Sequence, residues 1–289
     1  MVVHTPVVLS IQSHVVYGHV GNRSAVFPLE LLGIETWPLN TVQFSSHSGK
    51  PGWKGSFFPS QHITDVIDAL KVLAVLKNCD AIISGYIGNV AMGEAIIGAV
   101  KQIVQANSAA LYCCDPVMGD FPEGYYVAPG LFDFFKQSAL PLATIVTPNQ
   151  FEAELFYGQS IQNDADTAKA ADSIHALGPA IVIITSCRSG RSDSIKVMLS
   201  CKAGKYYVET PLLAFDSAPK GSGDLFTALF LGHYLLTHDP VLALENSTNT
   251  IWSILELTHE RGLTELAILQ SAAAILLPPK RFTAHRYTF

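Results

Sequence analysis

The sequence lacks the features that mark several large classes of protein. It has no run rich in lysine or arginine, and its formal net charge of −6 provides no electrostatic footprint for nucleic acid or an anionic membrane. Its most apolar stretch, residues 225–236, is too short to cross a bilayer and is interrupted by Gly232 and His233. We therefore expect no nucleic-acid partner and no membrane anchor.

A disulfide or structural zinc framework is also missing. The chain has five cysteines, an odd number, and no two of them form a C-x-x-C pair. The N-terminus has neither the basic region nor the cleavage site of a secretory signal. These absences predict a soluble cytoplasmic protein whose cysteines are reduced.

Two familiar nucleotide-binding signatures are absent as well. No Gly-x-x-x-x-Gly-Lys-Ser/Thr string occurs, and no Gly-x-Gly-x-x-Gly string follows a predicted strand, which excludes Walker-type and dinucleotide sites. What is present is a chain of 289 residues with 49% hydrophobic content, ample for a large core. We find no linker, low-complexity tract or internal repeat, so residues 1–289 are expected to form a single domain.

Short β-type runs alternate along the chain with segments of helical periodicity. The expected strands are 7–11, 35–42, 79–84, 110–115, 144–147 and 180–186, and the expected helices between them are 22–32, 63–76, 90–106, 149–157 and 164–177. A hairpin is then expected from 196–200 and 205–209, followed by three helices. The pattern predicts an α/β fold of three layers, α/β/α, with a mostly parallel central sheet.

The most informative motif is Gly221-Ser222-Gly223-Asp224, which is followed at once by an apolar helical run. Glycines on both sides of a small hydroxyl residue let successive backbone N–H groups point to one spot, where an anion can bind. Asp224 lies in the first turn, where the helix dipole favours an ionised carboxylate that can accept a proton from a hydroxyl. The pairing predicts phosphoryl transfer to an alcohol, although ordinary turns and caps have the same composition.

Several polar residues fall at the carboxyl ends of predicted strands, where ligands collect in open parallel sheets. Asp115 precedes a proline that disfavours helix and so keeps the carboxylate at the strand tip. Asn149 and Glu152 are three residues apart and share one face of a helix. Asp115 and Glu152 would suit Mg²⁺, but a turn aspartate and a plain capping box explain the same residues.

The N-terminal third carries hydroxyls, imidazoles and aromatic rings on three further strand ends, at 11–22, 42–49 and 84–86. Together they could line a pocket for a flat polar heterocycle, although histidines and tyrosines on loops are usually amphipathic surface residues. A polar loop at 186–193, with Arg188 and Arg191, is either a flap over phosphate or a solvated loop.

Taken together, these residues resemble the pyridoxal kinase family of the ribokinase-like superfamily. The resemblance covers about residues 7–260 and rests on five strings in family order: Ser10–Arg23, Val42–Ser45, Asp115–Asp120, Thr147–Leu155 and Gly221–Phe226. It implies a ribokinase-like fold and ATP-dependent phosphorylation of the 5′-hydroxyl of pyridoxal, and possible use of pyridoxine and pyridoxamine, in vitamin B6 salvage. It also implies ATP and Mg²⁺ as cofactors and a homodimer, and it leaves open a requirement for a monovalent cation.

By position, the resemblance implies three groups of site residues. Asp224 would be the base in a catalytic corner with Gly221, Ser222 and Gly223. The substrate-binding residues would be Ser13, Ser48, Gly49, Tyr86 and Asp224. The ATP-binding residues would be Asp115, Thr147, Asn149, Glu152, Thr185, Thr210, Pro211, Leu212 and Leu213, with Asp115 and Glu152 as metal ligands.

Two segments depart from the family pattern. Ser48-Gly49-Lys50-Pro51 differs from the commoner threonine-containing version, which leaves the preference among B6 vitamers open. The loop at 187–193 is short, which leaves closure of the ATP site open. Two other functions stay open as well: a non-catalytic protein that binds and delivers B6 vitamers, and a kinase of another hydroxymethyl heterocycle such as hydroxymethylpyrimidine.

Overall fold

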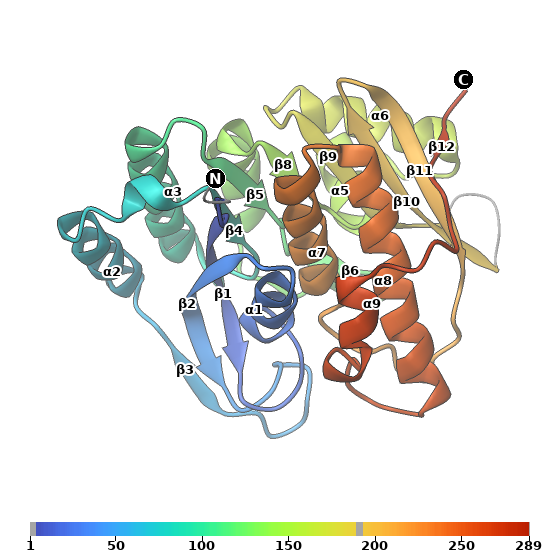
Figure 1. Ribbon diagram of the computed structural model, residues 1–289, viewed down its shortest axis with the longest axis horizontal. Helices are drawn as coiled ribbons and strands as arrows, with labels where there is room; N and C mark the ends of the chain where they lie inside the picture. Colours follow the sequence, from blue (N-terminus) through green and yellow to red (C-terminus); the bar gives the residue numbers. More distant parts are fainter. Residues whose placement is uncertain (1–3, 189–192, 289) are drawn as a thin grey trace.

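The computed structural model describes residues 4–188 and 193–288, and in this part of the chain a ten-stranded sheet runs through the molecule (Figure 1). Its strand order is β12-β11-β10-β9-β8-β5-β4-β1-β2-β3. The parallel strands are β1 (Val7–Val15), β2 (Glu35–Phe44), β4 (Ala81–Ser84), β5 (Leu111–Cys114), β8 (Ile145–Val146) and β9 (Ile181–Cys187). The antiparallel strands lie at the two edges: β3 (Gly55–Phe57) at one, and β10 (Ser194–Cys201), β11 (Gly204–Pro211) and β12 (His285–Arg286) at the other.

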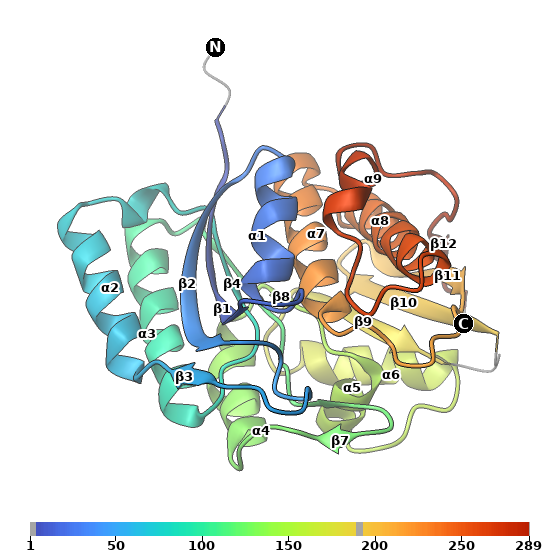
Figure 2. The ribbon, with the colours of Figure 1, turned by 90° about the horizontal axis from the view of Figure 1, so that it is seen from below.

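Helices cover both faces of this sheet, as Figure 2 shows from below. One face carries α1 (Asn22–Leu31), α7 (Ser222–Thr237), α8 (Pro240–Glu260) and α9 (Ala272–Leu276). The other carries α2 (Ser60–Val72), α3 (Val90–Ala106), α4 (Leu131–Phe134), α5 (Gln150–Tyr157) and α6 (Asp164–His175). The predicted three-layer α/β/α architecture with a mostly parallel sheet is therefore confirmed.

The central strands are apolar on both sides because each of their faces is buried. On β4, Ile82 belongs to the core under α2 and α3, whereas Ala81 and Ile83 belong to the core under α1 and α7. All three side chains are 0% exposed. Continuous apolar runs of this kind are expected when helices cover both faces of a parallel sheet.

Most predicted elements lie close to their expected ranges, and several of the shortest elements were missed. The helix predicted at 90–106 has these bounds as α3, where the Asn89 side chain accepts the N–H of Met92 as an N-cap. The expected hairpin is present as β10 and β11. The sequence did not predict β3, β12 or the small separate hairpin of β6 (Gly119–Asp120) and β7 (Gly124–Tyr125), because two or three residues show no periodicity.

Two further predictions concern membrane-spanning segments and the polar loop at 186–193. Across 4–188 and 193–288, no helix is long and apolar enough to cross a membrane. Of the loop predicted at 186–193, residues 189–192, with Arg191, lie outside the described residues. The division of the chain into one domain, 1–289, stays a prediction.

Candidate active site

The glycine corner begins α7 and is packed tightly against the loop between β1 and α1. Gly221 is the residue before the helix, and its φ of 92° lies in the left-handed region that glycine adopts without strain. A Cβ on Gly221 would collide with the backbone carbonyl oxygen of His19. This close approach brings the start of α7 to the carboxyl end of β1.

Asp224 is held in place by groups from the N-terminal part of the chain. Its Oδ2 accepts the backbone N–H of Gly21 at 2.8 Å. Gly21 in turn lies directly against Ser13, because a Cβ there would collide with the carbonyl and hydroxyl oxygens of Ser13. On another side, a Cβ on Gly85 would lie 3.4 Å from Asp224 Oδ1, and Tyr86 follows Gly85. The predicted base is thus linked to Ser13 through Gly21, and it lies close to Gly85, the residue before Tyr86.

Asp115 reaches the same place from the end of β5. Its side chain is buried, and its Oδ2 accepts a hydrogen bond from the Thr227 hydroxyl at 3.4 Å. The same hydroxyl lies 2.8 Å from the hydroxyl oxygen of Thr147 at the end of β8. A Cβ on Gly223 would lie 3.9 Å from Asp115 Oδ2. Asp115 and Thr147 therefore meet the glycine corner through α7.

Glu152 forms the capping box that its spacing from Asn149 predicted as one explanation. It is also buried next to the acidic site. The Asn149 side chain accepts the Glu152 N–H at 2.9 Å, and Glu152 Oε2 accepts the Asn149 N–H at 2.9 Å, so a full capping box begins α5. The other oxygen, Oε1, accepts the N–H of Met118 at 2.8 Å. The Asn149 amide also donates to the Gly119 carbonyl at 2.8 Å, which ties α5 to the β6–β7 hairpin.

Three carboxyl groups crowd this edge of the sheet, and burial dominates their titration. Burial raises the pKa of Glu152 to about 8, although its backbone N–H partners oppose the shift. Burial, followed by the negative charges of Glu152 and Asp224, raises the pKa of Asp115 well above its usual range. Burial also raises the pKa of Asp224 to about 6, against the lowering effect of the Gly21 N–H. Asp224 therefore remains an ionisable base as the motif predicts, but burial, which outweighs the hydrogen bond from Gly21, makes it more basic than an exposed aspartate.

The donor set fits a hard divalent cation. Repulsion between buried carboxylates is what a bound cation relieves, and carboxylate oxygens are the ligands that Mg²⁺ prefers. Within the described ranges, no group of three or more His, Cys, Asp or Glu side chains is arranged to hold a metal ion by itself. This geometry suits Mg²⁺, which usually takes one or two carboxylates, with waters and substrate phosphates completing its coordination.

Other predicted residues lie farther from this acidic cluster. Thr185 is close to α5, since its N–H donates to the Pro148 carbonyl at 2.9 Å and it bridges to Asn149. Ser48 and Gly49 are exposed in the loop between β2 and β3. The segment 210–213 lies at the end of β11, which three strands separate from β5. The structure therefore gathers most of the predicted site and leaves these two segments at its periphery.

The sequence model of a family described as Phosphomethylpyrimidine kinase matches residues 61–266. The chain is 42% identical over 282 residues to a protein of Rubrobacter xylanophilus named "Pyridoxal kinase PdxY", covering 96% of this chain and 97% of that one. A Deinococcus radiodurans protein with the same name is 41% identical over 285 residues, covering 96% of both chains. This chain belongs to the pyridoxal kinase family.

Solved pyridoxal kinases have the same fold. The enzyme of Leishmania donovani, in complex with ADP and pyridoxine, superposes with a TM-score of 0.90 at 28% identity, over 98% of this chain and 99% of that one. The enzyme of Trypanosoma brucei superposes with a TM-score of 0.86 at 29% identity, over the same fractions. The ribokinase-like fold expected for this pyridoxal kinase relative is confirmed.

Sequence reasoning missed two residues that organise the site. Thr227 joins Asp115 to Thr147, and it lies three residues after Asp224, so helical spacing placed it on the same face of α7. That spacing was a usable signal. The N–H of Gly21 gave no signal, because nothing in the local sequence indicates that it meets a carboxylate more than two hundred residues away.

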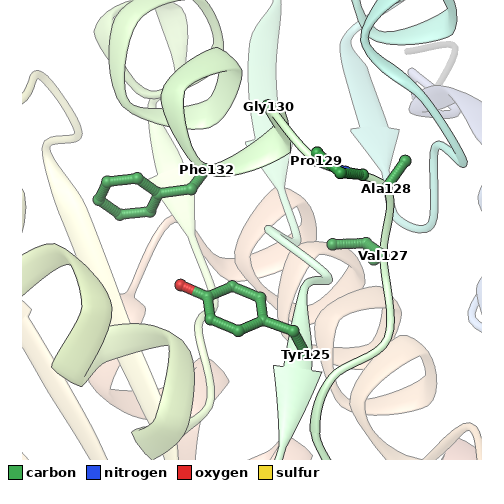
Figure 3. A pocket seen from close by; sticks show the side chains of 6 residues that line it. All are labelled: Tyr125, Val127, Ala128, Pro129, Gly130 and Phe132. Carbon is green, nitrogen blue, oxygen red and sulfur yellow. The ribbon is translucent and has the colours of Figure 1, made fainter.

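A separate cavity of about 320 Å³ lies beside β7 and the start of α4 (Figure 3). It is lined by Tyr125, Val127, Ala128, Pro129, Gly130 and Phe132, none of which is a predicted site residue. The Tyr125 ring packs edge-on against Phe151 of α5, with centroids 5.3 Å apart. The cavity thus lies between the end of the β6–β7 hairpin and the start of α4.

Proposed function

We propose that this protein transfers the γ-phosphoryl group of ATP to the 5′-hydroxyl of pyridoxal, giving pyridoxal 5′-phosphate in vitamin B6 salvage. The observation that carries the proposal is the position of Asp224 at the start of α7. Gly21 holds it beside Ser13, and the Asp115 carboxylate approaches the same corner from β5. The full-length relatives named pyridoxal kinase, and the similar fold that binds ADP and pyridoxine, support this substrate pair.

Asp224 acts in this mechanism as the acceptor of the hydroxyl proton. As the 5′-oxygen attacks the γ-phosphorus, the proton passes to Asp224 and ADP leaves. A pKa of about 6 leaves the carboxylate mostly ionised at neutral pH and makes it a better base than an ordinary aspartate. The backbone N–H groups of 221–223 at the start of α7 stabilise the charge on the transferring oxygens.

Asp115 and Glu152 hold Mg²⁺ in this proposal. The ion, held by these two residues, would supply positive charge that neutralises the charge developing on the transferred phosphoryl group. Asp115 approaches the corner at Gly223, while the backbone hydrogen bonds of Glu152 keep its carboxylate in one orientation. Burial raises the pKa of both groups, so a bound cation would favour the ionised form of each carboxylate.

The remaining predicted residues are assigned to the vitamer or to ATP. We assign Ser13, Ser48, Gly49 and Tyr86 to the vitamer, and Thr147, Asn149, Thr185, Thr210, Pro211, Leu212 and Leu213 to ATP. Ser13 lies against Gly21, which binds Asp224, and Thr227 joins Thr147 to Asp115; these contacts support the assignments of Ser13 and Thr147 most directly.

A kinase of hydroxymethylpyrimidine is the second candidate, because the matching sequence model bears the name of a phosphomethylpyrimidine kinase. That match begins at residue 61 and so excludes Ser13 and the segment 48–49, which the full-length pyridoxal kinase relatives cover. Those residues are the ones assigned to the vitamin ring, which favours pyridoxal. A protein that only binds vitamers has no use for Asp224 and the acids beside it.

One assay separates the three functions. Purified protein is incubated with Mg-ATP and, separately, pyridoxal, pyridoxine, pyridoxamine or hydroxymethylpyrimidine, and both ADP and the phosphorylated product are measured. We expect ADP formation matched by pyridoxal 5′-phosphate. Turnover of hydroxymethylpyrimidine alone would establish the second candidate, and vitamer binding without ADP formation would establish the non-catalytic protein.

We also propose a homodimer in the cytoplasm. The homodimer rests on the family resemblance, and sedimentation of the purified protein tests it. The compartment is supported by the five cysteines, all of which are free, with Cys79, Cys113, Cys114 and Cys187 buried. Fractionation of cells from the source organism tests the compartment.

A further inference from the structure

The loop between β2 and β3, residues 45–54, carries Ser48 and Gly49 at its tip, and its base is firmly held. The Ser45 N–H donates to the Lys54 carbonyl at 2.7 Å, and the Lys54 N–H donates to the Ser45 hydroxyl at 2.9 Å. The Trp53 ring packs on Phe44 with centroids 4.6 Å apart. Strands β2 and β3 therefore fix the path of the chain where the loop begins and ends.

A long side chain, that of Lys50, connects the tip to the body of the protein. Ser48 and Gly49 are exposed, and the turn that contains them is closed by the Lys50 N–H donating to the His47 carbonyl at 3.1 Å. The Lys50 ammonium forms an ion pair and hydrogen bond with Glu265, and it lies 4.4 Å from the centroid of the Tyr17 ring. Lys50 thus joins the tip to two segments distant in the sequence.

Glu265 is a rigid anchor for this contact. The next three residues, 266–268, are each 1% exposed, and the Ala267 N–H donates to the Thr258 hydroxyl at 3.0 Å. Glu265 also lies against the chain between Ser13 and Gly21: Gly18 has a φ of 101°, and a Cβ there would lie 2.6 Å from Glu265 Oε2. The anchor is therefore fixed to the segment that also positions Asp224.

We propose that Lys50 and Glu265 are a positioning pair that holds Ser48 and Gly49 against the vitamer ring. The inference rests on the proposed function. The two side chains are 29% and 14% exposed, so solvent screens this pair less than a fully exposed one. Because Asp115 and Glu152 lie on other elements, the pair sets the affinity for the vitamer and leaves ATP binding unchanged.

The test uses Lys50→Met, which keeps an unbranched apolar side chain and removes the charge. We expect the KM for pyridoxal to rise about fivefold, while the KM for ATP and the kcat at saturating pyridoxal stay within about twofold of wild type. Lys50→Arg keeps the charge and should retain most of the affinity. Lys205→Met is the matched control, because Lys205 is 24% exposed and pairs with Asp172 at 2.6 Å on the far edge of the sheet.

A second measurement does not depend on turnover. Amide hydrogen exchange of residues 45–54 without ligands should be faster in Lys50→Met than in wild type and unchanged in Lys205→Met. Unchanged exchange together with an unchanged KM for pyridoxal would overturn the inference, as would an equal rise in the KM for ATP. A wild-type protein that turns over no vitamer would refute the proposed function, while the exchange comparison would still decide whether Lys50 positions the loop.

Discussion

At the scale of single residues, Asp224 shows how the surroundings change the chemistry of a short motif. The sequence places a carboxylate in the first turn of a helix, where its charge is favoured. In the folded protein the same carboxylate is half-buried and interacts with the charge of Asp115, and desolvation raises its pKa to about 6. The motif predicted the residue, but only the packing around it set its basicity.

Replacement of this residue gives the first prediction. Asp224→Asn keeps the size of the side chain and the hydrogen bond from Gly21, but it removes the proton acceptor. We expect kcat with pyridoxal to fall by about 10² or more, with the fold and ADP binding retained. Steady-state kinetics and calorimetric titration with ADP measure both, with Asp172→Asn as the control. Near-normal turnover by Asp224→Asn would remove this residue from the role of base.

At the scale of elements, the sequence predicts the cap at the start of α5 but not the contacts that α5 makes with the rest of the protein. The spacing of Asn149 and Glu152 indicates a capping box because both hydrogen bonds form within one turn of helix. The bond from Met118 to Glu152 depends on the β6–β7 hairpin, whose two-residue strands show no pattern in the sequence. A local motif can be recognised from spacing, whereas contacts across the sheet cannot.

Removal of the cap gives a prediction at this scale. Asn149→Ala loses the bonds to the Glu152 N–H and the Gly119 carbonyl, so the free energy of unfolding should fall by about 1 kcal/mol. Because α5 borders the acidic cluster, the KM for ATP should rise as well. Urea unfolding and steady-state kinetics measure the two effects.

Asn163→Ala provides the matched control for this substitution. Asn163 caps α6 through the Asp166 N–H at 3.0 Å, away from the acidic cluster. It should lose similar stability without a change in the KM for ATP. If both variants raised that KM equally, α5 would have no special part in binding the nucleotide.

At the scale of the whole molecule, one edge of the sheet gathers acids from three parts of the chain, and two of them, Asp115 and Glu152, are buried. Burial of Glu152 raises its pKa from 4.5 to about 8, so the folded state binds this proton more tightly than the unfolded state does. The resulting stability is present below about pH 4.5 and is lost as the pH rises through about 8. The site is thus built at a cost to stability that a cation would offset.

This cost predicts how ligand-free protein responds to pH. The unfolding free energy of wild type, relative to Glu152→Gln, should fall on the order of a few kcal/mol between pH 5 and pH 8. Comparison with the variant cancels the titration of unrelated groups such as His233. Mg²⁺ should raise the unfolding free energy of wild type more at pH 8 than at pH 5. Calorimetric unfolding with and without MgCl₂ measures both, and a difference that grows with pH in the opposite sense would contradict the argument.

The amino-acid sequence alone determined the alternation of strands and helices, the glycine corner before Asp224 and the cap at Asn149. Each of these depends on backbone periodicity or on hydrogen bonds between near neighbours, which spacing records directly. Tertiary structure decided that the Gly21 N–H meets Asp224, that Thr227 joins Asp115 to Thr147, and that Lys50 pairs with Glu265. These contacts depend on the strand order and on how helices cross the sheet, so no local pattern encodes them.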